Sequence, residues 1–137
     1  MIIDGKDLIL GRLASYAAKR ALLGENVDVV NCEKIVISGD KVALFKRYKR
    51  RADMGTYKGP FIHRDPAKLV KRTIRGMLPY KQERGRKAFK KVKCYTGIPL
   101  ELKDKTPETM EHAKISNSNI FKYAYVKDIS KFLGGKI

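Results

Sequence analysis

The stretch IIDGKDLILGRLASYAAKRALLGENVDVV, residues 2–30, predicts a strand, a helix and a second strand. Two short apolar runs, Ile2-Ile3 and Val27 to Asn31, lie at its ends. Between them, side chains recur with the period of one apolar helix face: Leu13, Ala14, Ala17, Ala18, Ala21 and Leu22. Gly24 supplies a stop for this helix. Two strands joined by a helix form a βαβ unit, so we expect an α/β fold with a parallel sheet.

A short strand, a helix and a loop are predicted next. The strand is Ile35 to Ile37, and its gap from the preceding strand is too short for a parallel crossover, so their relation stays open. Asp40 begins a helix that extends to about Arg51. The side chains expected to face inward from this helix are Val42, Phe45, Leu44 and Tyr48. Residues 52–64 contain several Gly and Pro and should form a loop.

Asp65-Pro66 is a strong start for a further helix, with Asp at the N-cap and Pro at the first helical position. Pro79 is expected to end this helix. Its predicted buried face consists of Leu69, Val70, Thr73, Ile74 and Met77. A short basic helix over 82–91 and a strand from Val92 to Tyr95 should follow. We assign to core packing the side chains of Met77, Leu78 and Phe89.

The last part of the chain, residues 100–137, is nearly balanced in charge and rich in turn residues. Thr106-Pro107-Glu108 could start a helical turn. A final short helix is suggested by Val126, Ile129, Phe132 and Leu133 ahead of Gly134-Gly135. No low-complexity linker precedes this segment, so we expect it to pack on the domain or on a partner.

Positive charge is concentrated in the middle of the chain. The net charge is +17 over 137 residues, a length typical of one domain. Residues 41–93 hold nineteen Lys and Arg against three acidic residues, a net charge of +16, whereas the flanking segments are nearly neutral. Such an excess implies a polyanionic partner. Its confinement to one segment indicates a localised binding surface.

The spacing and type of these basic residues favour nucleic acid over a merely solvated face. Residues 46–51 set five basic side chains together with no acid among them, although like charges one turn apart destabilise a helix. A surface that serves only solubility mixes both signs. Eight of the basic residues are Arg, whose guanidinium binds phosphate through two hydrogen bonds and stacks on bases. We therefore expect this segment to bind a nucleic acid.

Other function classes find little support. Cys32 and Cys94 have no partners at metal-ligand spacing and are expected to be free thiols in a reducing compartment. The turn at Ile9 to Arg12 could hold a phosphate, but it lacks both the Gly-x-Gly-x-x-Gly and the Walker pattern. His63 is isolated, and no carboxylates cluster as a metal-dependent nuclease requires. We expect no catalytic residue, metal, cofactor or small-molecule substrate, no signal peptide, and no membrane span.

Four motifs occur in the order and spacing of one known family: Leu10-Gly11-Arg12-Leu13-Ala14-Ser15, Val29-Val30-Asn31, Gly76-Met77-Leu78-Pro79 followed by Lys81, and Tyr95-Thr96-Gly97-Ile98-Pro99. Over residues 2–99 the chain thus resembles the ribosomal protein L13 family of the large subunit. The Gly-Met-Leu-Pro element is the most specific of the four. The tight Gly24 to Val27 connection, and a tail in place of a His-Pro-His-like ending, resemble the archaeal or eukaryotic branch.

The resemblance implies a three-layer α/β/α fold with a mostly parallel sheet of about four strands. It implies an RNA-binding ribosomal domain over residues 1–99, followed by a C-terminal extension over 100–137. The implied function is that of a structural constituent that binds and stabilises folded large-subunit rRNA, in early assembly and in the cytoplasm. The implied partners are this rRNA and neighbouring ribosomal proteins. Contacts made by the bacterial ending cannot be carried over to this tail.

Charge and expected exposure select the candidate RNA-binding residues: Lys46, Arg47, Lys49, Arg50, Arg51, Tyr57, Lys58, His63, Arg64, Lys68, Lys71, Arg72, Arg75, Lys81, Arg84, Arg86, Lys87, Lys90 and Lys91. Tyr57 and Phe61 could stack on splayed bases, while core packing is an equal alternative for Phe61. We also expect marginal order across 44–64 without RNA. Two other hypotheses stay open: a general DNA-architectural or RNA-chaperone protein, and a nucleic-acid-modifying enzyme.

Overall fold

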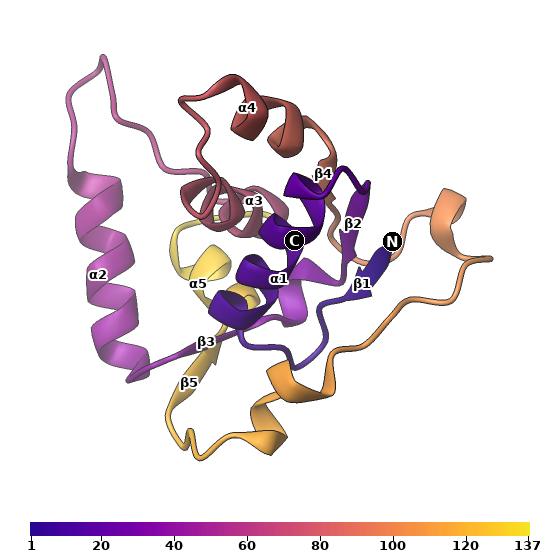
Figure 1. The fold of residues 1–137 in the computed structure, drawn as a ribbon. Helices are drawn as coiled ribbons and strands as arrows, with labels where there is room; N and C mark the ends of the chain where they lie inside the picture. The colour runs from indigo at the N-terminus through magenta and orange to yellow at the C-terminus, as the bar shows by residue number, and fades with distance from the viewer.

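The computed structural model describes all residues 1–137 and begins with the predicted βαβ unit (Figure 1). It consists of β1 (Ile2–Asp4), α1 (Leu10–Leu22) and β2 (Val27–Val30). β1 and β2 are parallel. Gly24 follows α1 with a φ of 100°, the left-handed conformation that ends many helices. The strand, helix and strand predicted from the opening stretch are confirmed.

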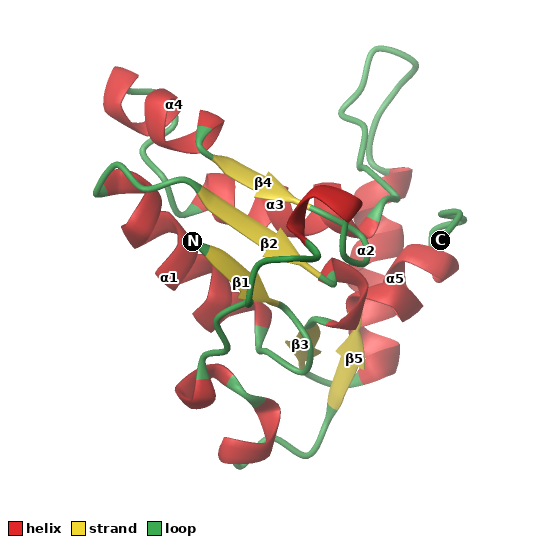
Figure 2. Ribbon diagram, turned by 90° about the vertical axis from the view of Figure 1, so that its right-hand side faces the viewer, coloured by secondary structure: helices red, strands yellow, loops and turns green.

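The main sheet has three parallel strands in the order β1-β2-β4, where β4 is Val92–Cys94 (Figure 2). An α/β fold with a mostly parallel sheet is therefore confirmed, with three strands rather than about four. The outer edge of β1 pairs with the segment around Glu108. The amide of Asp4 donates to the Glu108 carbonyl at 3.1 Å, and the Glu108 amide donates to the Ile2 carbonyl at 2.8 Å. The helical turn expected from Thr106 is wrong, because this segment pairs with β1 instead.

The strand expected at residues 35–37 joins a different sheet. β3 (Val36–Ser38) pairs antiparallel with β5 (Tyr123–Tyr125). Asn31 at the end of β2 has a left-handed φ of 55°, and a short 3-10 turn over Cys32–Lys34 follows it. The chain thereby leaves the main sheet before β3 begins, which settles the relation that the sequence left open.

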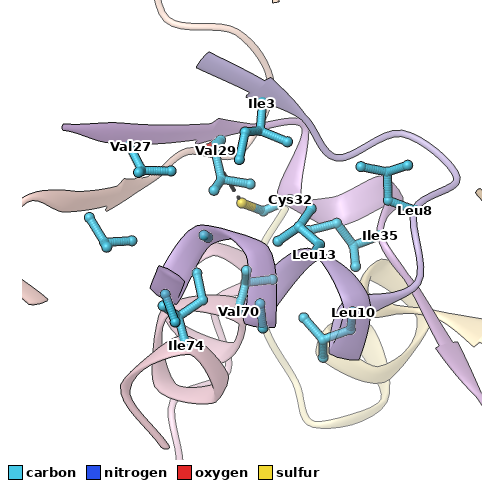
Figure 3. Packing of buried hydrophobic residues seen from close by; sticks show 14 of the residues in the cluster. Ile3, Leu8, Leu10, Leu13, Val27, Val29, Cys32, Ile35, Val70 and Ile74 are labelled. Atoms are coloured by element: carbon cyan, nitrogen blue, oxygen red, sulfur yellow. Dashed lines mark hydrogen bonds between the residues drawn. The ribbon is translucent and has the colours of Figure 1, made fainter. Parts of the chain in front are cut away.

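One face of the main sheet carries the core. Ile3, Val29 and Val92 are fully buried on this face, where they join Leu13 of α1 and Val70 of α3 (Pro66–Gly76) in one cluster (Figure 3). The strands alternate in the usual way, so Asp28 and Lys93 point to the opposite face and stay partly or fully exposed. The helices α1 and α3 therefore cover one face densely, while Asp28 and Lys93 lie on the other face of the sheet.

α3 begins and ends on local signals. The Asp65 carboxylate accepts a hydrogen bond from the Ala67 amide at 3.1 Å, as an N-cap should. The helix ends at Gly76, before Pro79, so Met77 lies beyond the buried face and is 40% exposed. Its assignment to the core is wrong. Leu78 is buried and Phe89 packs against the core, as predicted.

α2 (Lys41–Asp53) packs by a narrow strip on α5 (Val126–Phe132), the predicted final helix. Leu44 is the one buried residue of α2, and the Phe45 ring stacks on Phe132 with centroids 4.6 Å apart. Val42 is 60% exposed, so its predicted inward orientation is wrong. The contact side of α2 is set by α5, which lies about eighty residues further along the chain.

Residues beyond 100 are built into the same core as the first forty. Met110, Ala113 and Val126 belong to the main hydrophobic cluster. The Ile9 amide donates to the Ala113 carbonyl at 2.8 Å. The Tyr125 hydroxyl donates to the Asp7 carboxylate at 3.1 Å, and burial together with this bond raises the pKa of the phenol. The predicted division into a domain over residues 1–99 and an extension over 100–137 stays a prediction, which deletion of the extension can test.

A chain cut after residue 99 should lose cooperative folding. The cut removes β5 and the buried Val126 and Ile129, and so uncovers β3 and the start of α1. Thermal unfolding followed by circular dichroism would test this, with the full chain as control. A sigmoidal transition at the same temperature in both chains would contradict the account.

α4 (Glu83–Lys90) rests on the preceding turn through a glycine. A Cβ at Gly85 would lie 2.0 Å from the Pro79 carbonyl oxygen, whereas a Cβ at Gly76 would meet nothing within 4 Å. We expect Gly85→Ala to lower the free energy of unfolding by about 1–3 kcal/mol. Gly76→Ala should leave it unchanged or slightly raised. Urea denaturation of both variants would decide, and equal stabilities would show that the close approach is unimportant.

Candidate nucleic-acid interface

The basic segment forms one side of the molecule. α2, the loop 54–64, α3 and α4 follow one another there. The orange segment after residue 100 runs along the opposite side, and the chain then returns through β5 to place α5 beside α2 (Figure 1). We call the exposed cationic side chains between residues 46 and 91 the basic surface. Of the nineteen candidate residues, all are exposed except Lys71 and Lys91, which are half-buried.

Little of this charge is neutralised within the chain. Among the nineteen Lys and Arg of residues 41–93, two form ion pairs. Lys41 lies 3.2 Å from Asp128, and Lys87 lies 2.8 Å from Glu83. The other seventeen have no carboxylate within ion-pair distance. The basic surface therefore retains its attraction for a polyanion.

A groove of about 650 Å³ lies between α2, the loop, α3 and the start of α1. Three guanidinium groups line it, those of Arg47, Arg51 and Arg72, and we call it the arginine groove. Its apolar lining comes from side chains such as Leu44 and Leu69. α1 begins beside the groove without a side-chain cap, so the positive end of its dipole adds to the field.

A second depression of about 370 Å³ adjoins the groove, and we call it the basic hollow. Its lining is Phe61, His63, Lys68, Lys71, Arg72, Arg75 and Phe89. Phe61 and Arg72 line both depressions and so form the ridge between them. The Arg72 side chain also donates to the Phe61 carbonyl at 3.4 Å, which holds the loop against α3. The structure thus brings together candidates that are distant in sequence.

Other candidates lie outside these two depressions. Lys46, Lys49 and Arg50 surround a shallow site on another part of α2. Tyr57 is 87% exposed in the loop beside Lys58, and Phe61 is 69% exposed. Core packing, the alternative left open for Phe61, is therefore wrong. The remaining candidates lie on or next to α4: Lys81, Arg84, Arg86, Lys87, Lys90 and Lys91.

Two candidates already have structural partners. The Lys91 ammonium donates to the Gly24 carbonyl at 2.7 Å and ties the end of α4 to the end of α1. Lys87 is paired with Glu83 one turn away. Arg64 contributes its backbone carbonyl to the Ser130 hydroxyl, while its side chain stays exposed. Lys91 and Lys87 are accordingly the weakest of the candidate phosphate ligands.

Sequence reasoning missed several residues of the arginine groove. Ile9, Gly11, Ser38, Thr73 and Gly76 line it from three separate segments. None carries charge, so no charge pattern could find them. The glycines of the Leu-Gly-Arg and Gly-Met-Leu-Pro motifs were the available signal, because a glycine within a helical pattern often marks a close approach.

Metal-binding and nucleophilic groups outside the basic surface do not form a site. No three His, Cys, Asp or Glu side chains gather where they could hold a metal ion. Cys32 and Cys94 are free thiols, and the side-chain hydrogen bond between them, together with burial, raises the pKa of Cys32. Such a thiol is a poor nucleophile at neutral pH. Each helix is too short or too polar to cross a lipid bilayer.

Comparison with known proteins accounts for the sequence motifs. Residues 1–101 match the family described as Ribosomal protein L13. The chain belongs to the ribosomal protein L13 family. A relative in Methanococcoides burtonii, named large ribosomal subunit protein uL13, is 46% identical over 98% of both chains. Relatives of the same name in Archaeoglobus fulgidus and Halobacterium salinarum are 45% and 36% identical over 97% and 100% of this chain, covering 86% and 92% of their own lengths.

Membership of the L13 family answers the alternatives that charge alone left open. The family is a structural component of the ribosome, so the chain is a ribosomal protein rather than a nucleic-acid-modifying enzyme. The predicted family is confirmed, and archaeal relatives match this L13 chain through its tail, as the archaeal or eukaryotic features of the sequence suggest.

The loop and the second half of α2 should be weakly protected in the free L13 chain. One residue of α2 is buried, and the loop has two backbone hydrogen bonds of its own, both between Thr56 and Gly59. We expect fast amide hydrogen exchange across 45–62 and slow exchange in β2 and α1. Addition of rRNA should slow the exchange of 45–62. Uniformly high protection without RNA would contradict this.

Proposed function

We propose that this chain is a structural constituent of the large ribosomal subunit whose basic surface binds and stabilises folded large-subunit rRNA. The observation that carries the proposal is the set of seventeen Lys and Arg in residues 41–93 that have no ion-pair partner. The family supplies the type of RNA, because relatives are named as proteins of the large subunit. The place of action is then the cytoplasmic ribosome.

Affinity in this mechanism comes mainly from the release of counterions. Each phosphate that a Lys or Arg neutralises frees a condensed cation, so binding weakens steeply as salt rises. The cations stand on three helices and a loop that point in different directions. One protein can therefore contact several RNA segments at once and hold them in a fixed arrangement, which is the bracing function proposed here.

Direct contact with RNA also supports a role early in assembly. A surface with this many unpaired cations needs RNA, rather than a previously bound protein, as its first partner. The thin attachment of α2 further suggests that the segment becomes fully ordered on the RNA. Protein neighbours would join later, at exposed apolar side chains such as Leu23 and Phe121.

The arginines of the arginine groove should determine part of the salt dependence. We expect Arg47→Ala and Arg51→Ala each to weaken binding of transcribed large-subunit rRNA and to lower the slope of log K against log salt by about 1. Lys105→Ala is the matched control, since Lys105 is an exposed cation of the tail. Filter binding at several salt concentrations would measure both quantities. Equal effects of all three variants would refute a localised RNA interface.

A further inference from the structure

The arginine groove is more than a charged surface, because it combines an apolar lining with cations and hydroxyl groups. Leu44, Leu69 and Ile37 line it alongside its three arginines. Its volume of about 650 Å³ lies within the range of pockets that hold small ligands. Surfaces that bind only phosphate do not need an apolar lining. The groove is therefore suited to a ligand that is flat and apolar in part and bears negative charge nearby.

Two glycines leave space in the wall of this groove. Gly11 in α1 and Gly76 at the end of α3 both line it, and a Cβ at either would meet nothing within 4 Å. Neither has a positive φ, so the backbone does not require glycine. Packing does not require it either, and glycine destabilises a helix relative to alanine. The two glycines therefore give the groove a wall of backbone without side chains, which a ligand can approach closely.

Aromatic and guanidinium planes stand at the edge of the groove. The Phe61 ring is mostly exposed and lies on the ridge between the groove and the basic hollow. The Arg51 guanidinium is held over the Tyr48 ring, with its Cζ 5.6 Å from the ring centroid. Both kinds of plane stack on nucleobases in RNA-binding proteins. Ser38 adds a hydroxyl group that can bond to a base edge, and the Thr73 hydroxyl, which donates to the Leu69 carbonyl at 3.2 Å, can still accept.

We propose that the arginine groove takes one unstacked base of large-subunit rRNA, with the adjoining backbone phosphates in the basic hollow. This inference rests on the proposed function and names the nucleotide contact within it. The base lies against the bare wall at Gly11 and Gly76 and stacks on Phe61. Lys68, Lys71 and Arg75 line the hollow on the other side of Phe61, where the next phosphates would pass.

Charge complementarity favours a nucleotide over a protein segment in this groove. Three arginines and no acidic residue line it, so an apolar peptide would leave their positive charge without a counter-charge. A nucleotide satisfies both requirements, since its base fills the apolar space and its phosphates meet the cations. Bases free for such a contact occur in loops and bulges of folded RNA rather than in regular helices.

Filling the groove tests the inference. Gly76→Phe and Gly11→Phe each place a ring in the open space from a different helix, and they remove no charge. Ala43→Phe adds the same ring at an exposed position of α2 outside the groove. Phe61→Ala removes the stacking plane from a mostly exposed site, so its folding is not at risk. Circular dichroism would first establish that each variant is folded.

The probe is transcribed large-subunit rRNA, treated with dimethyl sulfate and carbodiimide to report base edges and with hydroxyl radicals to report the backbone. We expect the wild-type protein and Ala43→Phe to protect at least one unpaired base. The two filling variants and Phe61→Ala should leave this base as reactive as in free RNA and weaken binding about tenfold. Backbone protection at other positions should persist.

Three results would overturn the inference, and they differ in what they imply for the proposed function. If the filling variants protect the same bases with unchanged affinity, no base occupies the groove. If the wild-type protein protects the backbone but no unpaired base, the chain binds rRNA by its charge alone and the proposed function stands. If the wild-type protein does not bind this RNA at all, the proposed function fails as well.

Discussion

Repulsion among the unpaired cations of residues 41–93 is the constraint to which the rest of the structure responds. Like charges close together oppose compaction, and no internal acid relieves them. Most of the core comes from the nearly neutral residues 1–40. The basic segment contributes to it mainly through α3, and the tail adds Met110, Ala113 and Val126. α2 and the loop 54–64 are held at few points. The stable part of the molecule thus serves as a base from which the cations face outward.

The tail is essential to this arrangement. β1 would have a free edge without Glu108, and β3 would have no partner without β5. α2 would lose the Phe45–Phe132 stack and the ion pair between Lys41 and Asp128. The tail, whose net charge is small, is therefore the segment that supports α2, the first helix of the basic surface. Charge and scaffold are divided between different parts of the chain.

Local signals in the sequence were sufficient for much of this fold. The βαβ unit followed from apolar periodicity, and the starts of α2 and α3 followed from Asp40 and from Asp65-Pro66. The pairing of β3 with β5 could not be predicted, because each strand has three residues and they are more than eighty positions apart. The errors at Val42 and Met77 have the same origin. Which side of a helix is buried depends on neighbours that a local pattern does not contain.

The location of the exposed cations was predictable, and the shape of the surface that they form was not. Charge counting placed the basic surface correctly in residues 41–93, because electrostatic character survives folding on an exposed surface. The arginine groove is assembled from α1, β3, α2, the loop and α3, and all of its lining residues except Arg47, Arg51 and Arg72 are uncharged. A count of charges also could not reveal that the Lys91 ammonium donates a hydrogen bond to the Gly24 carbonyl. Only the folded structure distinguishes cations that are bonded within the fold from cations that stay exposed and free to bind a partner.

The central claim is that many separate phosphate contacts hold this chain in the large subunit. Sedimentation of the tagged full-length chain from a cell lysate, through gradients at low and then moderate salt, tests it most directly. The account predicts that the protein migrates with the large subunit at both salt concentrations, because the sum of many contacts leaves enough affinity at moderate salt even though binding weakens as salt rises. A protein that stays at the top of the gradient, or leaves the subunit at the first rise in salt, would contradict the claim.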